Sequence, residues 1–193
     1  MRYLFCLAAL LIVTAGCGSI KIETGRTAEE ETIVRASEAS ELRRTWARSF
    51  DSAAEFDKAA LLKQHIDSVS ARLVYIGRQF AREWDNGNRG RGQVIPAADF
   101  QRIIENSVAK DRPILQAWED NLEYGWEWVR DSSRFDSRVQ GLFGEMVQQY
   151  YDVYNVVFYP RSDEKAYGAE LDRAQDATES LSRQLARELD RYR

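Results

Sequence analysis

The chain has 193 residues, and its 27 lysines and arginines against 31 aspartates and glutamates give a formal net charge of −4. This mild acidity argues against a nucleic-acid-binding protein, because such proteins present basic patches to the phosphate backbone. The length is enough for one domain that buries on the order of 70% of the surface of its unfolded chain.

Residues 1–16 have the three parts of a secretory signal. Arg2 supplies a positive charge, 4–13 form an uninterrupted apolar run, and small residues follow up to Cys17. A run of about 10 apolar residues is too short for a transmembrane helix, which needs about 20. We therefore predict that residues 1–16 are removed during export.

The ending Thr14-Ala15-Gly16-Cys17 resembles the lipobox of bacterial lipoproteins, although Thr14 stands where that family usually has Leu. The resemblance covers only about the first 18 residues. It implies that the Cys17 sulfur takes a diacylglycerol, so that Cys17 carries fatty acids such as palmitate and becomes the first mature residue. The alternative is an ordinary signal with Cys17 as a structural thiol, but no later cysteine could pair with it.

The same resemblance implies a location. Gly18 follows the cysteine, whereas enterobacterial lipoproteins kept at the inner membrane typically have Asp there. We therefore expect an outer-membrane anchor facing the periplasm if the host is Gram-negative. Residues 17–26 would then hold the lipidated cysteine and a tether of about 30 Å at full extension. The single domain expected over 27–193 would stay close to its membrane.

The segment 27–84 is expected to be helical. A capping box, Thr-Ala-Glu-Glu at 27–30, opens it, and no Gly or Pro interrupts it before Gly77. Apolar residues recur at three- and four-residue spacing over 59–80, which is typical of a coiled-coil-like seam on a helix packed along its length.

The pattern leaves open whether this segment is one helix or two. A second capping box at 52–55 and a change in the phase of the apolar residues near Phe56 are compatible with two helices broken near Asp51. The alternative is one very long N-terminal helix of about 55 residues with a shift in its packing. Of these two alternatives, we include the single very long helix in the predicted fold.

Glycines and asparagines over 85–92 predict a loop that ends this segment. Pro96 suits the first position of a helix that runs through Val108, and Pro113 is expected to kink or restart it. The middle of the chain is therefore expected to contain one long loop followed by two helical segments.

Two long helices are expected after this. A serine pair at 132–133 can cap the helix 134–159, Pro160 ends it, and Ser162 can cap the last helix. The apolar residues of 134–159 span an arc of about 140°, so this helix is predicted at the centre. We predict an all-α fold, an antiparallel bundle of four to five helices.

Tryptophans and carboxylates alternate over 118–128, which suggests a sugar-binding or glycosidase site, since glycoside hydrolysis uses two acids about 5–10 Å apart. Helical projection favours core packing instead. Trp118 and Leu122 share one face, whereas Glu123 and its acidic neighbours point the opposite way. If the segment does contribute an aromatic ligand surface, its candidate residues are Trp118, Trp126, Tyr150 and Tyr154.

Metal chemistry finds little support in the sequence. His65 is the single histidine, and Cys6 lies in the signal, so zinc sites built from Cys and His are excluded if Cys17 is lipidated. No Glu-x-x-His motif of a di-iron bundle occurs. The stretch 85–92 fails as a calcium loop because Pro96 stands where an EF-hand needs Glu. We expect no cofactor other than the covalent lipid on Cys17.

These patterns predict a membrane-anchored cell-envelope lipoprotein that acts by binding or scaffolding, with no catalysis. Its expected partners are the membrane, through the lipid, and an envelope protein, but not nucleic acid. The alternative is a small-ligand carrier or chaperone with an aromatic pocket between helices, which would require an internal cavity. An envelope hydrolase is disfavoured because no nucleophile–base pair is evident.

Replacing Cys17 with alanine is expected to abolish lipid modification, because the thiol is the attachment site. The variant should leave the membrane fraction or accumulate as an uncleaved precursor. Labelling of cells with a radioactive fatty acid, followed by fractionation, checks both outcomes. Wild-type protein that takes up no label would contradict the lipoprotein interpretation.

Overall fold

The computed structural model describes residues 28–92 and 94–192. Over these residues the chain forms helices and short connections without a strand, which confirms the predicted all-α fold. Residues Thr32–Arg193 make one compact unit, and of the preceding unit, Met1–Glu31, only the last four residues are described. The predicted signal, the lipidation site Cys17 and most of the tether lie outside the described residues.

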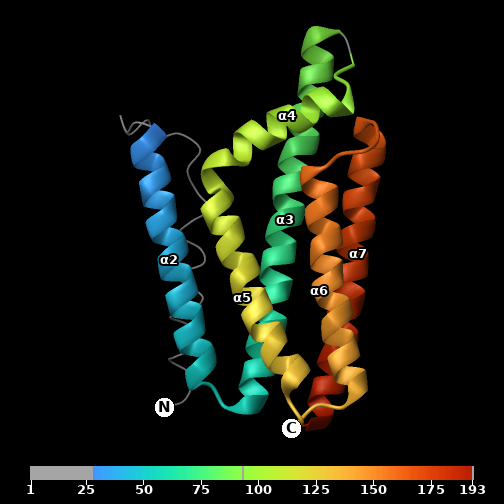
Figure 1. Ribbon diagram of the computed structural model, residues 1–193. Helices are drawn as coiled ribbons and strands as arrows, with labels where there is room; N and C mark the ends of the chain where they lie inside the picture. Colours follow the sequence, from blue (N-terminus) through green and yellow to red (C-terminus); the bar gives the residue numbers. More distant parts are fainter. Residues whose placement is uncertain (1–27, 93, 193) are drawn as a thin grey trace, which may run out of the picture. The chain divides into compact units, whose positions relative to one another are not determined.

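The helices follow one another through short connections (Figure 1). In chain order they are α2 (Ala28–Ser52), α3 (Glu55–Arg91), α4 (Ala97–Val108), the 3-10 turn η1 (Ala109–Asp111), α5 (Arg112–Asp131), α6 (Ser137–Phe158), α7 (Glu164–Leu189) and the 3-10 turn η2 (Asp190–Tyr192). Helices α3, α6 and α7 pack against one another, and α5 packs on α3 and α6. The compact unit is therefore a helical bundle.

The very long N-terminal helix of the prediction does not form, because the chain breaks between Ser52 and Glu55. Ala54 is extended, with φ −64° and ψ 155°, and its side chain provides no cap. The N-cap of α3 is Ala54, whereas Ser52 is still part of α2 and its hydroxyl donates to the carbonyl of Ser49, so the expected capping box at 52–55 is not made. The reversal lets Phe50 on α2 and the seam of α3 reach the same core, which one straight helix could not do.

The predicted loop at 85–92 is also wrong, because α3 continues to Arg91 and ends only at Gly92, whose φ of 60° is left-handed. Tertiary contacts explain the extra turns. The indole N–H of Trp84 donates to the carbonyl of Ile95 at 2.9 Å, and the side chain of Asn88 accepts from the Ile95 amide at 2.7 Å. These bonds outweigh the weak helix propensity of Gly and Asn.

The later helices begin and end close to the predicted residues, but other side chains than the predicted ones cap them. Pro113 lies in the first turn of α5 and restarts the helix after η1, as expected. The carboxylate of Asp136, not the serines at 132–133, caps α6, and that of Asp163, not Ser162, caps α7. An aspartate at this position satisfies free amides and also complements the helix dipole, so it competes well with serine.

Three helices approach one another closely at Gly77 on α3. A Cβ atom there would lie 2.6 Å from Cδ2 of Leu171 on α7 and 3.0 Å from Cγ2 of Val157 on α6. Both neighbours are buried, and α6 supplies the broad apolar face predicted for 134–159. Gly141, on the exposed side of α6, would bring a Cβ within 4 Å of nothing outside its own helix.

The two glycines predict opposite effects of the same substitution. Gly77→Ala should lower the free energy of unfolding by about 1 kcal/mol, because overpacking costs about 1–3 kcal/mol and helix propensity offsets at most about 1. Gly141→Ala should raise it by about 0.5–1 kcal/mol, since only the propensity term remains. Urea denaturation of both variants measures the difference, and an equal response would contradict the close packing at Gly77.

Candidate functional site

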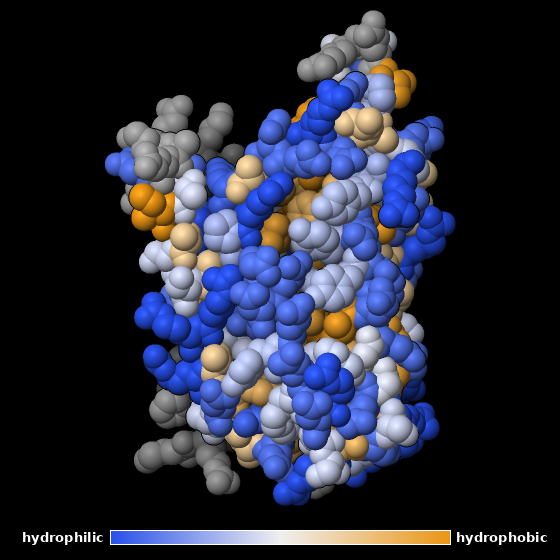
Figure 2. All heavy atoms as spheres, viewed as in Figure 1, coloured by the Kyte–Doolittle hydropathy of each residue, from blue (hydrophilic) through white to orange (hydrophobic). Residues whose placement is uncertain are grey.

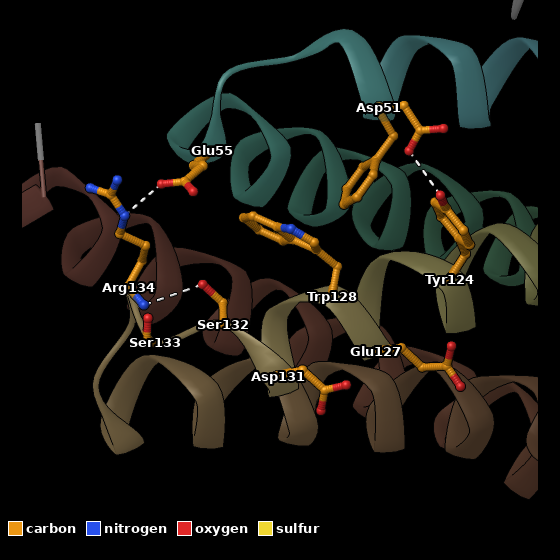
Figure 3. A pocket seen from close by; sticks show the side chains of 10 residues that line it. Asp51, Glu55, Tyr124, Glu127, Trp128, Asp131, Ser132, Ser133 and Arg134 are labelled. Carbon is orange, nitrogen blue, oxygen red and sulfur yellow. Dashed lines mark hydrogen bonds and ion pairs between the residues drawn. The ribbon is translucent and has the colours of Figure 1, made fainter.

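A groove lies where the α2–α3 connection meets the α5–α6 connection (Figure 3). It encloses about 490 Å³ and is named here the Trp128 groove. Its lining residues are Phe50, Asp51, Glu55, Tyr124, Glu127, Trp128, Asp131, Ser132, Ser133 and Arg134.

Polar contacts join the three segments that form the Trp128 groove. The hydroxyl of Tyr124 on α5 donates to Asp51 at the end of α2 over 2.8 Å. Glu55, the first residue of α3, pairs with the guanidinium of Arg134 at 2.5 Å. The indole of Trp128 lies between these two contacts (Figure 3). The groove thus has an aromatic floor and two polar rims.

The lining of the Trp128 groove is predominantly negative, with four carboxylates and one guanidinium. The hydrogen bond to Asp51, followed by burial, raises the pKa of Tyr124. The floor already holds a cation, since the Lys58 ammonium lies 5.5 Å from the ring centroids of both Phe50 and Trp128. Four carboxylates around the half-buried Trp128 and the exposed Tyr124 favour a basic side chain as occupant.

A second groove, of about 270 Å³, lies between α4, α5 and α6 and is named the Tyr154 groove. Figure 2 shows apolar surface in a hollow below α4, framed by polar residues. Its lining residues are Ile104, Glu105, Val108, Arg112, Leu115, Gln116, Glu119, Tyr154, Phe158 and Tyr159. Burial, and then the nearby charges of Glu123 and Asp120, raise the pKa of Glu119.

The four aromatic residues proposed from the sequence do not line either of these two grooves together. Trp118 is half-buried, with the Arg72 guanidinium carbon 5.9 Å from its ring centroid. Trp126 packs on α6, where a Cβ at Gly144 would lie 3.4 Å from its ring. Tyr150 and Tyr154 are neighbours, with ring centroids 6.4 Å apart, and of the four residues only Tyr154 lines either of the two grooves.

Helical projection correctly separated the faces of α5. Leu122, Gly125 and Val129 are buried, whereas Glu123 and Glu127 are exposed. Sequence patterns do not mark Asp51, Glu55 and Arg134 as site residues, because these residues come together only through two chain reversals. The sequence feature that could have indicated them is the high density of polar residues at the ends of α2 and α5.

Two features are absent from the described part of the chain, a metal-ligand cluster and a membrane-spanning helix. Its residues include no group of three or more His, Cys, Asp or Glu side chains arranged to hold a metal ion. None of its helices combines the length and apolar character needed to cross a membrane. In comparisons with protein-family models, curated proteins and solved structures, the chain matches none of them.

The contacts of His65 indicate a structural role. Its Nε2 lies 3.0 Å from the carbonyl oxygen of Trp118, and its ring centroid lies 5.3 Å from that of Trp46. Burial lowers the pKa of His65, and the hydrogen bond only partly opposes this. His65 therefore joins α3 to α5 and α2 in its neutral form.

The lowered pKa predicts a pH-dependent stability. A histidine whose folded pKa lies below its ordinary value of 6.5 contributes full stability above that pH, and loses it as the pH falls through the folded pKa. The free energy of unfolding should therefore drop between pH 7.5 and 5.5 more steeply for wild type than for His65→Gln. Parallel slopes in urea denaturation would contradict this.

Proposed function

We propose that the protein is a membrane-anchored lipoprotein of the bacterial cell envelope that binds a protein partner through the Trp128 groove. The observation that carries the proposal is an open groove with an aromatic floor and four carboxylates against one guanidinium. The partner would insert a lysine or arginine side chain. This role is binding or scaffolding, without a chemical step.

Two basic side chains of the protein itself already contact the groove, as the side chain of the partner is expected to do. Arg134 pairs with Glu55 at its rim, and Lys58 lies against its aromatic floor. Both Glu55 and Arg134 are exposed, so their ion pair contributes little stability, about 0–1 kcal/mol, and can exchange for a contact with a partner. Glu127 and Asp131, also exposed, add two carboxylates one helical turn apart.

Chain connectivity favours a groove that is directed away from the membrane. The predicted tether joins the domain at the start of α2, and the 25 residues of α2 span about 37 Å. Phe50 and Asp51 line the groove at the opposite end of that helix. Lipid anchoring through Cys17 would therefore leave the groove accessible to proteins in the surrounding compartment.

The packing of the bundle supports this proposal over a carrier built on the four aromatic residues. A carrier of that kind needs an internal apolar cavity. Tyr150 instead has no exposed surface, and Trp118 and Trp126 line neither groove. Of the four aromatic residues, only Tyr154 lines the Tyr154 groove, together with residues of α4, α5 and the end of α6.

Site-specific photo-cross-linking in cells tests the proposal. A photoreactive residue at Ser133, on the rim of the groove, should capture a partner, whereas one at the exposed Glu145 of α6 should not. The double variant Glu127→Gln/Asp131→Asn should reduce capture about 3- to 10-fold, because each exposed charge pair contributes about 0.2–1 kcal/mol.

The matched control is Glu83→Gln/Glu145→Gln, which removes two exposed carboxylates outside the groove. It should capture as wild type does. Mass spectrometry should map the adduct to a segment of the partner that contains Lys or Arg. Equal capture from both label positions, or capture that is insensitive to the charges of the groove, would contradict the proposal.

A further inference from the structure

The connection between α2 and α3 reverses the chain without the residues that usually make a reversal. Ala53 and Ala54 are the two residues between these helices, and Ala54, at the N-cap of α3, makes no capping bond with its side chain. No Gly or Pro occurs between residues 27 and 76. Because alanine has the highest helix propensity of all residues, the local sequence favours a helix that continues through this point.

The other connections of the described chain do contain such residues. Helix α3 ends at Gly92, whose φ of 60° is left-handed, and α4 begins after Pro96. Helix α5 has Pro113 in its first turn. The carboxylates of Asp136 and Asp163 cap α6 and α7. Among the described connections, the α2–α3 reversal is therefore the one that depends on tertiary contacts instead of its own sequence.

The other helices of the bundle do not need α2 in order to pack together, since α3, α5, α6 and α7 contact one another directly. Among the described side chains of α2, Ala39 and Phe50 are buried, and Phe50 packs against Tyr124 and Trp128 of α5. Loss of α2 would expose these rings to water, so a bundle without any α2 is disfavoured. The surface that α2 covers fits the α2 helix of a second copy as well as it fits its own.

A helical connection would join α2 and α3 into one continuous helix. The last carbonyls of α2 and the first amides of α3, which lack helical partners at a chain break, would then bond to each other. Over residues 28–91 such a helix is about 95 Å long, and its α2 part extends about 37 Å beyond the start of α3. In this form α2 cannot lie along α5 of its own chain.

We propose that two copies of the chain exchange α2 through a straightened α2–α3 connection and form a two-fold symmetric dimer. The ion pair between Arg43 and Asp120 would then join the two copies. Because α2 makes the same contacts in both forms, the connection and the protein concentration decide between monomer and dimer. Phe50 and Asp51 line the Trp128 groove, so each groove of the dimer would be built from both copies. The exchange does not depend on the partner proposed for that groove.

Cross-linking between copies tests the exchange. One full-length chain carries Arg43→Cys and a second carries Asp120→Cys, and in both chains Cys6 and Cys17 are replaced by serine. The two chains are mixed in urea and refolded together at high protein concentration, and gel filtration separates monomer from dimer. A short bismaleimide should join the two chains in the dimer, because positions 43 and 120 face each other across the contact of α2 with α5. The monomer should give no product that contains both chains.

A single chain with both substitutions is the positive control, and its monomer should cross-link internally. This control shows that the two positions are within reach of the reagent. A dimer of two unexchanged copies would also cross-link within each chain and would not join the two singly substituted chains. Absence of a dimer after refolding at high concentration, or a dimer without the product that contains both chains, would overturn the proposal.

Variants of the connection test its role. Ala54→Gly should lower the association constant of the dimer about 5- to 30-fold, because both connections of the dimer lose helix propensity. Ala36→Gly, at an exposed position of α2 that is helical in both forms, is the matched control and should leave the constant unchanged. Insertion of Gly-Ser-Gly-Ser between Ala53 and Ala54 should abolish the dimer, since a flexible connection lets α2 fold back on its own chain. A dimer that withstands this insertion would contradict the exchange.

Discussion

The aromatic cluster around Phe50 holds the N-terminal helix against the bundle. Phe50 stacks on Trp46 at 4.7 Å and meets the edges of Tyr124 and Trp128 at 5.8 and 5.6 Å. It is 1% exposed although it lies two residues from the end of α2. Aromatic pairs of this kind contribute about 0.5–1.5 kcal/mol each beyond the area that they bury. The cluster therefore fixes the position of the chain reversal.

The rest of the attachment of α2 is weaker. Ion pairs link Arg35 to Asp111 at 3.1 Å and Arg43 to Asp120, and all four side chains are more than a third exposed. Such pairs contribute about 0–1 kcal/mol and are screened by salt. The close approach at Gly125 adds to the cluster, because a Cβ atom there would lie 2.9 Å from Cη2 of Trp46.

One wall of the Trp128 groove depends on this reversal. Asp51 and Glu55 stand on either side of the break, and Asp51 meets Tyr124 because α2 turns back along α5. The groove would lose one wall if α2 continued straight into α3. The Tyr154 groove, formed by α4, α5 and α6, does not include a residue of α2. The two grooves can therefore be altered independently.

The sequence predicted the features that depend on periodicity. The seam of α3, the broad apolar face of α6 and the faces of α5 follow from apolar spacing, because burial repeats with the helical turn. It did not predict that α3 extends to Arg91, because Trp84 and Asn88 bond to Ile95 across a turn whose geometry is not encoded locally. The phase change near Phe56 did indicate the break, but only tertiary packing decides between a shifted helix and a reversed one. The grooves could not be predicted, since Asp51 and Tyr124 are 73 positions apart.

The distance between α2 and α3 tests the reversal most directly. Spin labels at the exposed positions Ser37 and Ala71, in a chain whose Cys6 and Cys17 are replaced by serine, report it by pulsed electron paramagnetic resonance. If α2 folds back, the two positions lie at nearly the same level of the bundle, and the labels should be less than about 30 Å apart. A single continuous helix would separate them by about 50 Å, at 1.5 Å per residue. A dominant distance near 50 Å would contradict the fold and remove the basis for the Trp128 groove.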